Sequence, residues 1–173
     1  VGDYMLQNDQ IRVIVQDKGY SRGFGIYGGS IIDADLVRAR GTHGNSATAN
    51  GYDNFGEMFP SFFLEAMEPN SITVVGDSKS DEEDQADAIA ACGEPEERAV
   101  ALHVRAYGSD FLAMTESINE VLLGDDRSLP ALQFDTCYRL APGDRYIEIE
   151  TTVTNIDISP KTFPGVTSFG DIP

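Results

Sequence analysis

The feature that most constrains the fold is an alternating pattern between Tyr138 and Asn155. Apolar or β-branched residues occupy every second position from Ile147 to Val153, and glutamate or threonine stands between them. A period of two is typical of a strand with one buried and one solvated face. Residues 141–144, Ala-Pro-Gly-Asp, predict a turn, because proline presets φ and glycine tolerates positive φ. We therefore expect a β-hairpin whose apolar face meets a core.

Shorter stretches of the same alternation predict further strands, at residues 11–15, 30–37, 71–75 and 99–107. A turn is expected at Pro69-Asn70, just ahead of the strand at 71–75. The chain has 173 residues, which is enough for one domain with a core. The predicted fold class is all-β: an antiparallel β-sandwich with long loops and at most one short helix, forming a single domain over residues 1–173.

The charge balance restricts the partners of this chain. It carries 29 acidic and 12 basic residues, a formal net charge of −17, which repels phosphate backbones and argues against nucleic-acid binding. No apolar run reaches the roughly 18–20 residues of a membrane span. The expected partners are a carbohydrate or another protein, with self-association as a further option. The chain starts at Val1 without a signal peptide, as a mature or trimmed product would.

Acidic residues are concentrated in the segment 76–98, which holds nine of them. Such a run is typical of a solvated surface excursion, because neighbouring carboxylates repel one another and are costly to bury. Residues 86–91 favour a helical turn within it. We expect a mobile acidic loop here.

The cysteine count is compatible with one disulfide, between Cys92 and Cys137. A loop of about 45 residues closed in this way gives roughly 4 kcal/mol in the chain-entropy model. The acidic composition and the β-rich pattern suit a secreted, periplasmic or cell-surface protein, where disulfides persist. Two buried thiols are the alternative.

Aromatic residues in glycine-rich loops are the candidate ligand-binding residues. Exposed rings of this kind stack on the C–H faces of sugars, which would make the domain carbohydrate-binding. The alternative is that these rings pin the loops to the core. The candidates are Tyr20, Phe24, Tyr27, Tyr52 and Phe55.

Carboxylates near the same loops are the candidate metal ligands. Asp33 and Asp35 lie two apart, so on a strand they share a face, and Asp53 and Glu57 flank a turn. Calcium takes several oxygen ligands from carboxylates and loop carbonyls, so calcium is the expected cofactor. The alternative is turn capping and solvation.

The histidines do not predict a catalytic or zinc site. His43 and His103 lie about 60 residues apart, without the spacing of a zinc site. We expect each of them to be a surface or hydrogen-bonded histidine.

Several landmarks occur together in a recognisable order. They are L-x-N-D-x-I-R-V-x-V from Leu6 to Val15, a Gly28-Gly29 pair before a strand, Y-x-L-x-P-G from Tyr138, and F-G-D at 169–171. Together they resemble the N-terminal part of the β-supersandwich of the galactose-mutarotase-like superfamily. The same order is similar to the opening domain of large secreted bacterial proteins that carry a metallohydrolase domain further along. The resemblance implies that the chain is part of a larger sandwich.

The chain departs from that superfamily at its catalytic position. Mutarotase-like enzymes place a histidine shortly after the T-N strand, where this chain has Val-Thr-Ser-Phe at 166–169. We therefore expect a non-catalytic module with a carbohydrate-binding or structural role. The alternatives are a sugar-processing enzyme of mutarotase or lyase type, with catalytic residues partly outside this chain, and a self-assembling surface or filament subunit.

Overall fold

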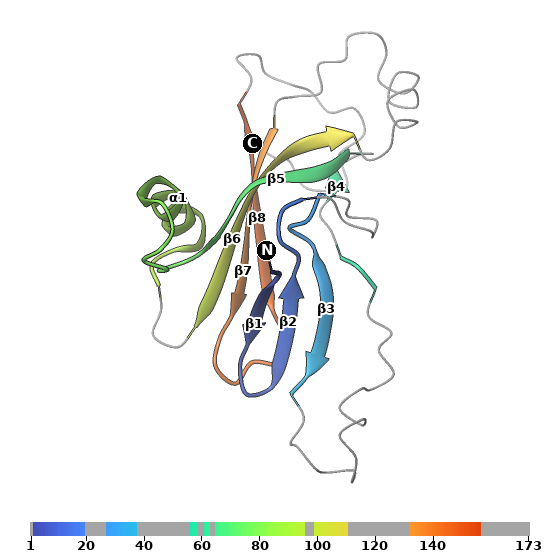
Figure 1. Cartoon of the computed structure of the whole chain (residues 1–173), viewed down its shortest axis with the longest axis vertical. Helices are drawn as coiled ribbons and strands as arrows, with labels where there is room; N and C mark the ends of the chain where they lie inside the picture. The colour runs from blue at the N-terminus through green and yellow to red at the C-terminus, as the bar shows by residue number, and fades with distance from the viewer. Residues whose placement is uncertain are drawn as a thin grey trace.

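The computed structural model is mostly β-strands in two antiparallel sheets, with one helix in the part of the chain that it describes (Figure 1). This confirms the predicted fold class. The described residues are 2–19, 27–37, 56–58, 61–62, 65–95, 99–110 and 132–156.

The first sheet has three strands in the order β1-β2-β3. The strands are β1 (Tyr4–Gln7), β2 (Ile11–Val15) and β3 (Ile31–Leu36). Every second residue of β2 is buried, as its alternating pattern predicts. Just before β3, Gly28 and Gly29 have φ values of +88° and +72°, a conformation that glycine adopts without strain.

The second sheet has five strands in sequence order, β4-β5-β6-β7-β8. They are β4 (Ser61–Phe62), β5 (Glu65–Val74), β6 (Val100–Asp110), β7 (Leu132–Leu140) and β8 (Glu148–Asn155). The expected turn at Pro69-Asn70 is wrong, because β5 runs straight through these residues. A register shift between Pro69 and Ser71 accommodates the proline, which has no backbone N–H for the ladder.

The predicted hairpin between Tyr138 and Asn155 is confirmed as β7 and β8. Gly143 takes a φ of +82° in the connecting turn. The alternation places Ile149 opposite Tyr138 on the inner face, yet Ile149 remains 40% exposed. β8 is an edge strand of the five-stranded sheet, so its apolar side chains are less buried than the alternating pattern predicted.

The main core lies between the two sheets. It combines residues of β1, β2 and β3 with the inner faces of β6 and β7, and consists of Leu6, Ile11, Val13, Val15, Ile31, Leu102, Val104, Tyr138 and Leu140. A smaller cluster continues along the inner face of the five-stranded sheet through Met67, Ala106, Leu132 and Phe134.

Two turns far apart in sequence are joined at one end of the sandwich. The side-chain nitrogen of Asn8, in the β1–β2 turn, donates to the carbonyl oxygens of Ala141 (2.7 Å) and Asp144 (2.9 Å) in the β7–β8 turn. Its side-chain oxygen accepts from the backbone N–H groups of Gln10 and Ile11. Asn8 therefore shapes its own turn and attaches it to the other sheet.

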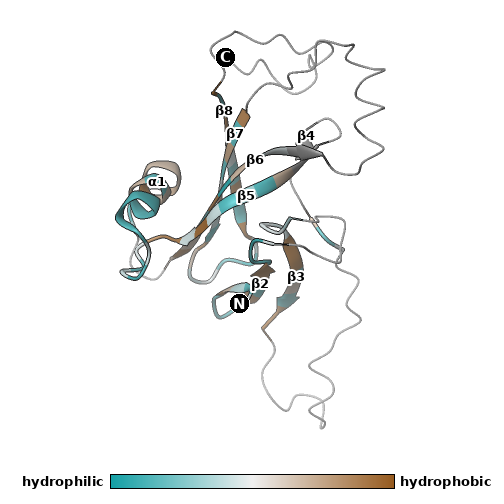
Figure 2. Ribbon diagram, turned by 45° about the horizontal axis from the view of Figure 1, so that its top comes forward, coloured by the Kyte–Doolittle hydropathy of each residue, from teal (hydrophilic) through white to brown (hydrophobic). Residues whose placement is uncertain are grey.

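The helix α1 (Glu82–Cys92) packs against β5, β6 and β7 on the side of the five-stranded sheet away from β1–β3 (Figure 1). The expectation of a loop over 76–98 is therefore wrong for residues 82–92, whereas the helical turn expected at 86–91 is confirmed. Its carboxylates do not prevent helix formation, because three of them lie in the first turn, where the helix dipole favours negative charge. Figure 2 shows these first turns as hydrophilic. No helix in the described ranges is long and apolar enough to span a membrane.

Candidate functional site

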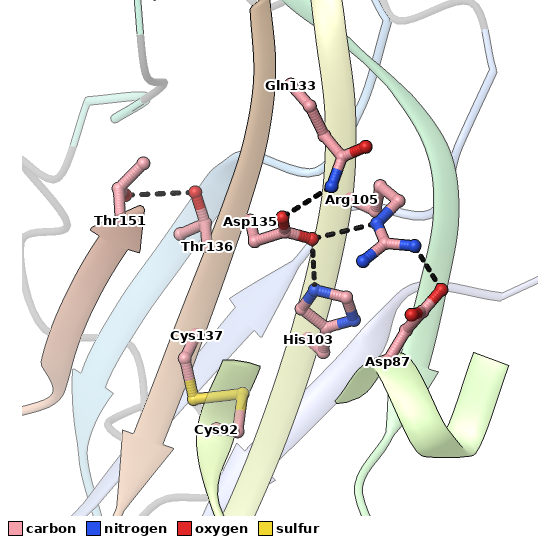
Figure 3. A network of polar contacts seen from close by, with 9 residues as sticks. All are labelled: Asp87, Cys92, His103, Arg105, Gln133, Asp135, Thr136, Cys137 and Thr151. Carbon is pink, nitrogen blue, oxygen red and sulfur yellow. Dashed lines mark hydrogen bonds and ion pairs between the residues drawn. A yellow bond between two sulfur atoms is a disulfide. The ribbon is translucent and has the colours of Figure 1, made fainter. Parts of the chain in front are cut away.

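A network of polar and ionisable side chains lies between α1 and the five-stranded sheet, with Asp135 at its centre (Figure 3). One oxygen of Asp135, Oδ1, lies 2.9 Å from His103 Nε2 and accepts from Arg105 Nε at 2.8 Å. The other, Oδ2, accepts from Gln133 Nε2 at 2.7 Å. Arg105 also pairs with Asp87 of α1. We call these five residues the helix-side cluster.

Strand register assembles the helix-side cluster. Arg105 of β6 stands opposite Asp135 of β7, and His103 stands opposite Cys137. All four lie on the face that points away from the main core, because their neighbours along each strand point into it. Cys137 is bonded to Cys92 at the end of α1, so the disulfide and the helix-side cluster lie under the same helix (Figure 3).

The electrostatics of the cluster favour an ionised carboxylate. Burial raises the pKa of Asp135, but hydrogen bonds from Gln133, Arg105 and His103 outweigh it, so the pKa lies below its usual value. Burial lowers the pKa of Arg105, and the neighbouring Asp135 and Asp87 more than reverse this. An ionised Asp135 only accepts hydrogen bonds, so His103 Nε2 carries the hydrogen in their contact.

A His–Asp pair is a familiar device for moving protons, but this one is closed to substrates. His103 is 0% exposed, and its other ring nitrogen is buried and has no hydrogen-bond partner among the described residues. A general base must come within hydrogen-bond reach of the proton that it removes. Within the helix-side cluster, the ion pair between Arg105 and Asp87 joins the sheet to α1.

Two open hollows in the described part of the chain are candidate ligand sites. The first, which we call the Tyr27 hollow, has a volume of about 410 Å³. Tyr27 is half-buried there, while Lys18 and Glu68 are exposed beside it. The hollow is lined by Lys18, Gly19, Tyr27, Glu68 and Pro69.

Backbone contacts position the residues of the Tyr27 hollow. The N–H of Gly19 donates to the carbonyl of Tyr27 at 2.9 Å, and Lys18 Nζ donates to the carbonyl of Asn70 at 3.2 Å. An aromatic ring, a carboxylate and an ammonium group therefore surround one open space. Such a combination offers an apolar surface together with a hydrogen-bond acceptor and a donor.

The second hollow, which we call the arginine groove, has a volume of about 330 Å³. It lies between β2 and β3 on one side and the residues just before β8 on the other. It is lined mostly by apolar side chains, with a few charged ones: Ile11, Arg12, Val13, Ala34, Asp35, Leu36, Arg145, Tyr146 and Ile147.

Of the aromatic residues singled out from the sequence, the structure places Tyr27 at a hollow. The other four, Tyr20, Phe24, Tyr52 and Phe55, lie outside the described residues. Their role in ligand binding stays a prediction.

The candidate metal ligands are only partly described. Asp33 and Asp35 lie on β3, and Asp35 forms an ion pair with Arg12 at 3.3 Å. Glu57 precedes Met58, whose backbone pairs with that of Ile31 at the start of β3. Asp53 lies outside the described residues. Within those residues, no group of three or more histidine, cysteine, aspartate or glutamate side chains is placed to hold a metal ion. Calcium binding stays a prediction.

The disulfide between Cys92 and Cys137 is confirmed. His103 is hydrogen-bonded, as the sequence suggested, but its complete burial was not anticipated. The helix-side cluster and the arginine groove were both missed. The available signal for the cluster was polar residues two apart on neighbouring strands, His103 with Arg105 and Gln133 with Asp135. That signal becomes informative only once the register is known.

Comparisons of this chain with protein-family models, with curated proteins and with solved structures each find no match.

Proposed function

We propose that this β-sandwich is a non-catalytic, carbohydrate-binding module and that the Tyr27 hollow receives the sugar. The observation that carries the proposal is the position of Tyr27 beside an exposed carboxylate, Glu68, and an exposed ammonium group, Lys18, around one open space. Sugars present both C–H faces and hydroxyl groups. The ring suits the C–H faces, and the two charged groups suit the hydroxyl groups.

The scaffold beneath the hollow supports a preorganised site. Pro69 is buried in β5, and Gly19 is hydrogen-bonded to Tyr27. Residues held by a sheet lose less conformational entropy when a ligand binds, and this saves binding free energy. The superfamily resemblance of the sequence agrees with a sugar ligand.

The position of the helix-side cluster favours binding over catalysis. General acid–base chemistry on a sugar requires proton-transfer groups that reach its hydroxyl groups. His103 and Asp135 form such a pair, but the side chains of both are almost completely buried. The enzyme alternative places its catalytic residues partly outside this chain. The disulfide supports a secreted, periplasmic or cell-surface location, since disulfides persist in oxidising compartments.

The test is a titration of the whole chain with a panel of neutral mono- and oligosaccharides, in which binding is monitored by NMR. At least one saccharide is expected to shift the resonances of Tyr27 and Gly19. Tyr27→Ala should weaken its binding roughly tenfold, the equivalent of about 1.4 kcal/mol from lost ring contact. Tyr146→Ala is the matched control, because it removes an exposed tyrosine from the other hollow.

Three results would contradict the proposal. The first is that no saccharide binds at millimolar concentration, and the second is that both tyrosine variants weaken binding equally. The third is mutarotation of fresh glucose or galactose above the buffer background in polarimetry, which would favour the enzyme alternative.

A further inference from the structure

Arg145 differs from the other arginines of the described ranges. These ranges contain four arginines, and three of them pair with carboxylates: Arg12 with Asp35, Arg105 with Asp135 and Asp87, and Arg139 with Glu148. Arg145 has no carboxylate partner among the described residues and makes one hydrogen bond, from Nε to Gln10 Oε1 at 3.1 Å. Its terminal nitrogens remain available to a ligand.

The hydrogen bond to Gln10 ties Arg145 to the β1–β2 turn. Gln10 belongs to the β1–β2 turn, which Asn8 already joins to the β7–β8 turn through two hydrogen bonds. The N–H of Gly143 also donates to Asp9 Oδ1 at 3.1 Å. A guanidinium held in this way loses less freedom when it binds an anion.

Arg145 stands at the rim of an apolar hollow. Ile11 and Val13 are buried residues of the main core, whereas Leu36 and Tyr146 are 55% and 64% exposed. Large exposed apolar side chains beside a concave surface mark ligand sites more often than a plain protein surface. The groove thus combines apolar walls with one available cation.

We propose that the arginine groove binds a small, free monocarboxylate with an apolar body. The apolar body lies against Leu36, Ile147 and Tyr146, and the carboxylate pairs with the fork of Arg145, whose planar geometry fits two carboxylate oxygens. Charge favours this class over phosphate compounds, since the net charge of −17 repels multiply charged anions while one guanidinium balances one carboxylate. The site is separate from the Tyr27 hollow and does not depend on sugar binding.

The experiment uses hexanoate as the probe and 1-hexanol as its neutral counterpart, each titrated into the whole chain. The methyl resonances of Leu36 and Ile147 are followed by NMR. Hexanoate should bind in the millimolar range, and Arg145→Gln should weaken it at least tenfold, because a charge-assisted pair is lost. The same variant should change the affinity for 1-hexanol less than twofold. Lys18→Gln, which removes an exposed cation from the Tyr27 hollow, is the matched control and should leave hexanoate binding unchanged.

The inference is overturned if hexanoate leaves both methyl resonances unshifted, or if Arg145→Gln binds it as tightly as the unaltered chain does. Equal weakening by Lys18→Gln would also overturn it, since that result indicates general charge attraction. Arg145 is exposed, so its variant should remain folded, and the methyl spectrum of the unliganded variant checks this directly.

Discussion

The hydroxyl of Tyr138 donates a 2.9 Å hydrogen bond to the carbonyl oxygen of Gly29, and this buried contact joins the two sheets. Tyr138 belongs to β7, and Gly29 lies just before β3. The position requires glycine, because φ is +72° and a Cβ would lie 2.8 Å from Pro69 Cγ and 3.0 Å from Val104 Cγ1. The bend before β3 thus brings a backbone acceptor to the tyrosine at the centre of the core.

Tyr138→Phe should lower the free energy of unfolding by about 1–2 kcal/mol, because the Gly29 carbonyl is then buried without its donor. Urea unfolding followed by circular dichroism measures the change. Tyr146→Phe removes a hydroxyl from an exposed ring and should have an effect below about 0.5 kcal/mol. Equal effects of the two substitutions would mean that the contact with Gly29 adds nothing.

Tyr138 should also make the protein sensitive to alkaline pH. Burial raises the pKa of Tyr138 to about 12, whereas an unfolded chain releases this proton near pH 10. The contribution of neutral Tyr138 to the free energy of unfolding is fully present below about pH 10 and is lost as the pH rises toward 12. The loss amounts to roughly 2–3 kcal/mol. Unfolding free energies measured between pH 9 and 12 should fall more steeply for the unaltered chain than for Tyr138→Phe, and parallel curves would contradict this.

Asn8→Ala should destabilise the sandwich by about 2–4 kcal/mol, because four hydrogen bonds of its side chain are lost. Asn8→Asp is the informative comparison. It keeps the acceptor for Gln10 and Ile11 but places a carboxylate against the carbonyls of Ala141 and Asp144. In thermal unfolding, both variants should have a midpoint temperature well below that of the unaltered chain. A midpoint for Asn8→Asp close to that of the unaltered chain would show that the bonds to the β7–β8 turn matter little.

Local patterns predict the strands of this protein better than its sites. The period of two identified β2 and the β7–β8 hairpin, because burial of one face leaves a direct trace in the sequence. It failed at Pro69, where a register shift admits a residue that normally interrupts a strand. The helical turn expected at 86–91 is only part of α1. Just two residues of that helix, Ala88 and Cys92, are buried, so almost no apolar stripe marks its full length.

The sites depend on register and on contacts between distant residues. The helix-side cluster needs Arg105 opposite Asp135 and α1 above both, and no local pattern contains that pairing. The arginine groove brings the β7–β8 turn against β2 and β3, and Gln10 and Arg145 are 135 positions apart. The cysteine pair was predictable because only one intramolecular pairing exists for two cysteines.

Asp135 should make stability depend on pH in the acid range. Its pKa is lower in the folded chain than the value near 3.9 of an unfolded one, so its contribution is fully present above about pH 5 and is lost as the pH falls through the folded pKa. Asp135→Asn should be less stable at pH 7 and should lose less stability on acidification. Urea unfolding at pH 7, 5, 4 and 3 tests this, with Asp33→Asn of β3 as the control outside the cluster. Parallel curves for Asp135→Asn and the unaltered chain would contradict the expectation.

Reduction of the disulfide should release α1 before the sandwich unfolds. Ala88 and Cys92 are the buried residues of the helix, and three polar contacts add to its docking: Asp87 with Arg105, Gln85 with the backbone of β5, and Arg139 with the Cys92 carbonyl. Apolar burial therefore contributes little to its docking. The covalent link, which is worth about 4 kcal/mol in the chain-entropy model, holds the helix in place.

Hydrogen exchange measured by mass spectrometry, with and without a dithiol reductant, tests this order of events. Amides of 82–92 should exchange much faster after reduction, while those of 100–106 in β6 stay protected. His103 should then react with diethyl pyrocarbonate, because the helix no longer covers it. Cys92→Ala with Cys137→Ala should reproduce the reduced state without reductant, and Asp87→Ala, which removes one ion pair and keeps the disulfide, should have a smaller effect. If reduction changes the exchange of neither segment, the polar contacts alone hold α1. If the amides of β6 lose protection together with those of 82–92, the helix and the sandwich unfold as one cooperative unit.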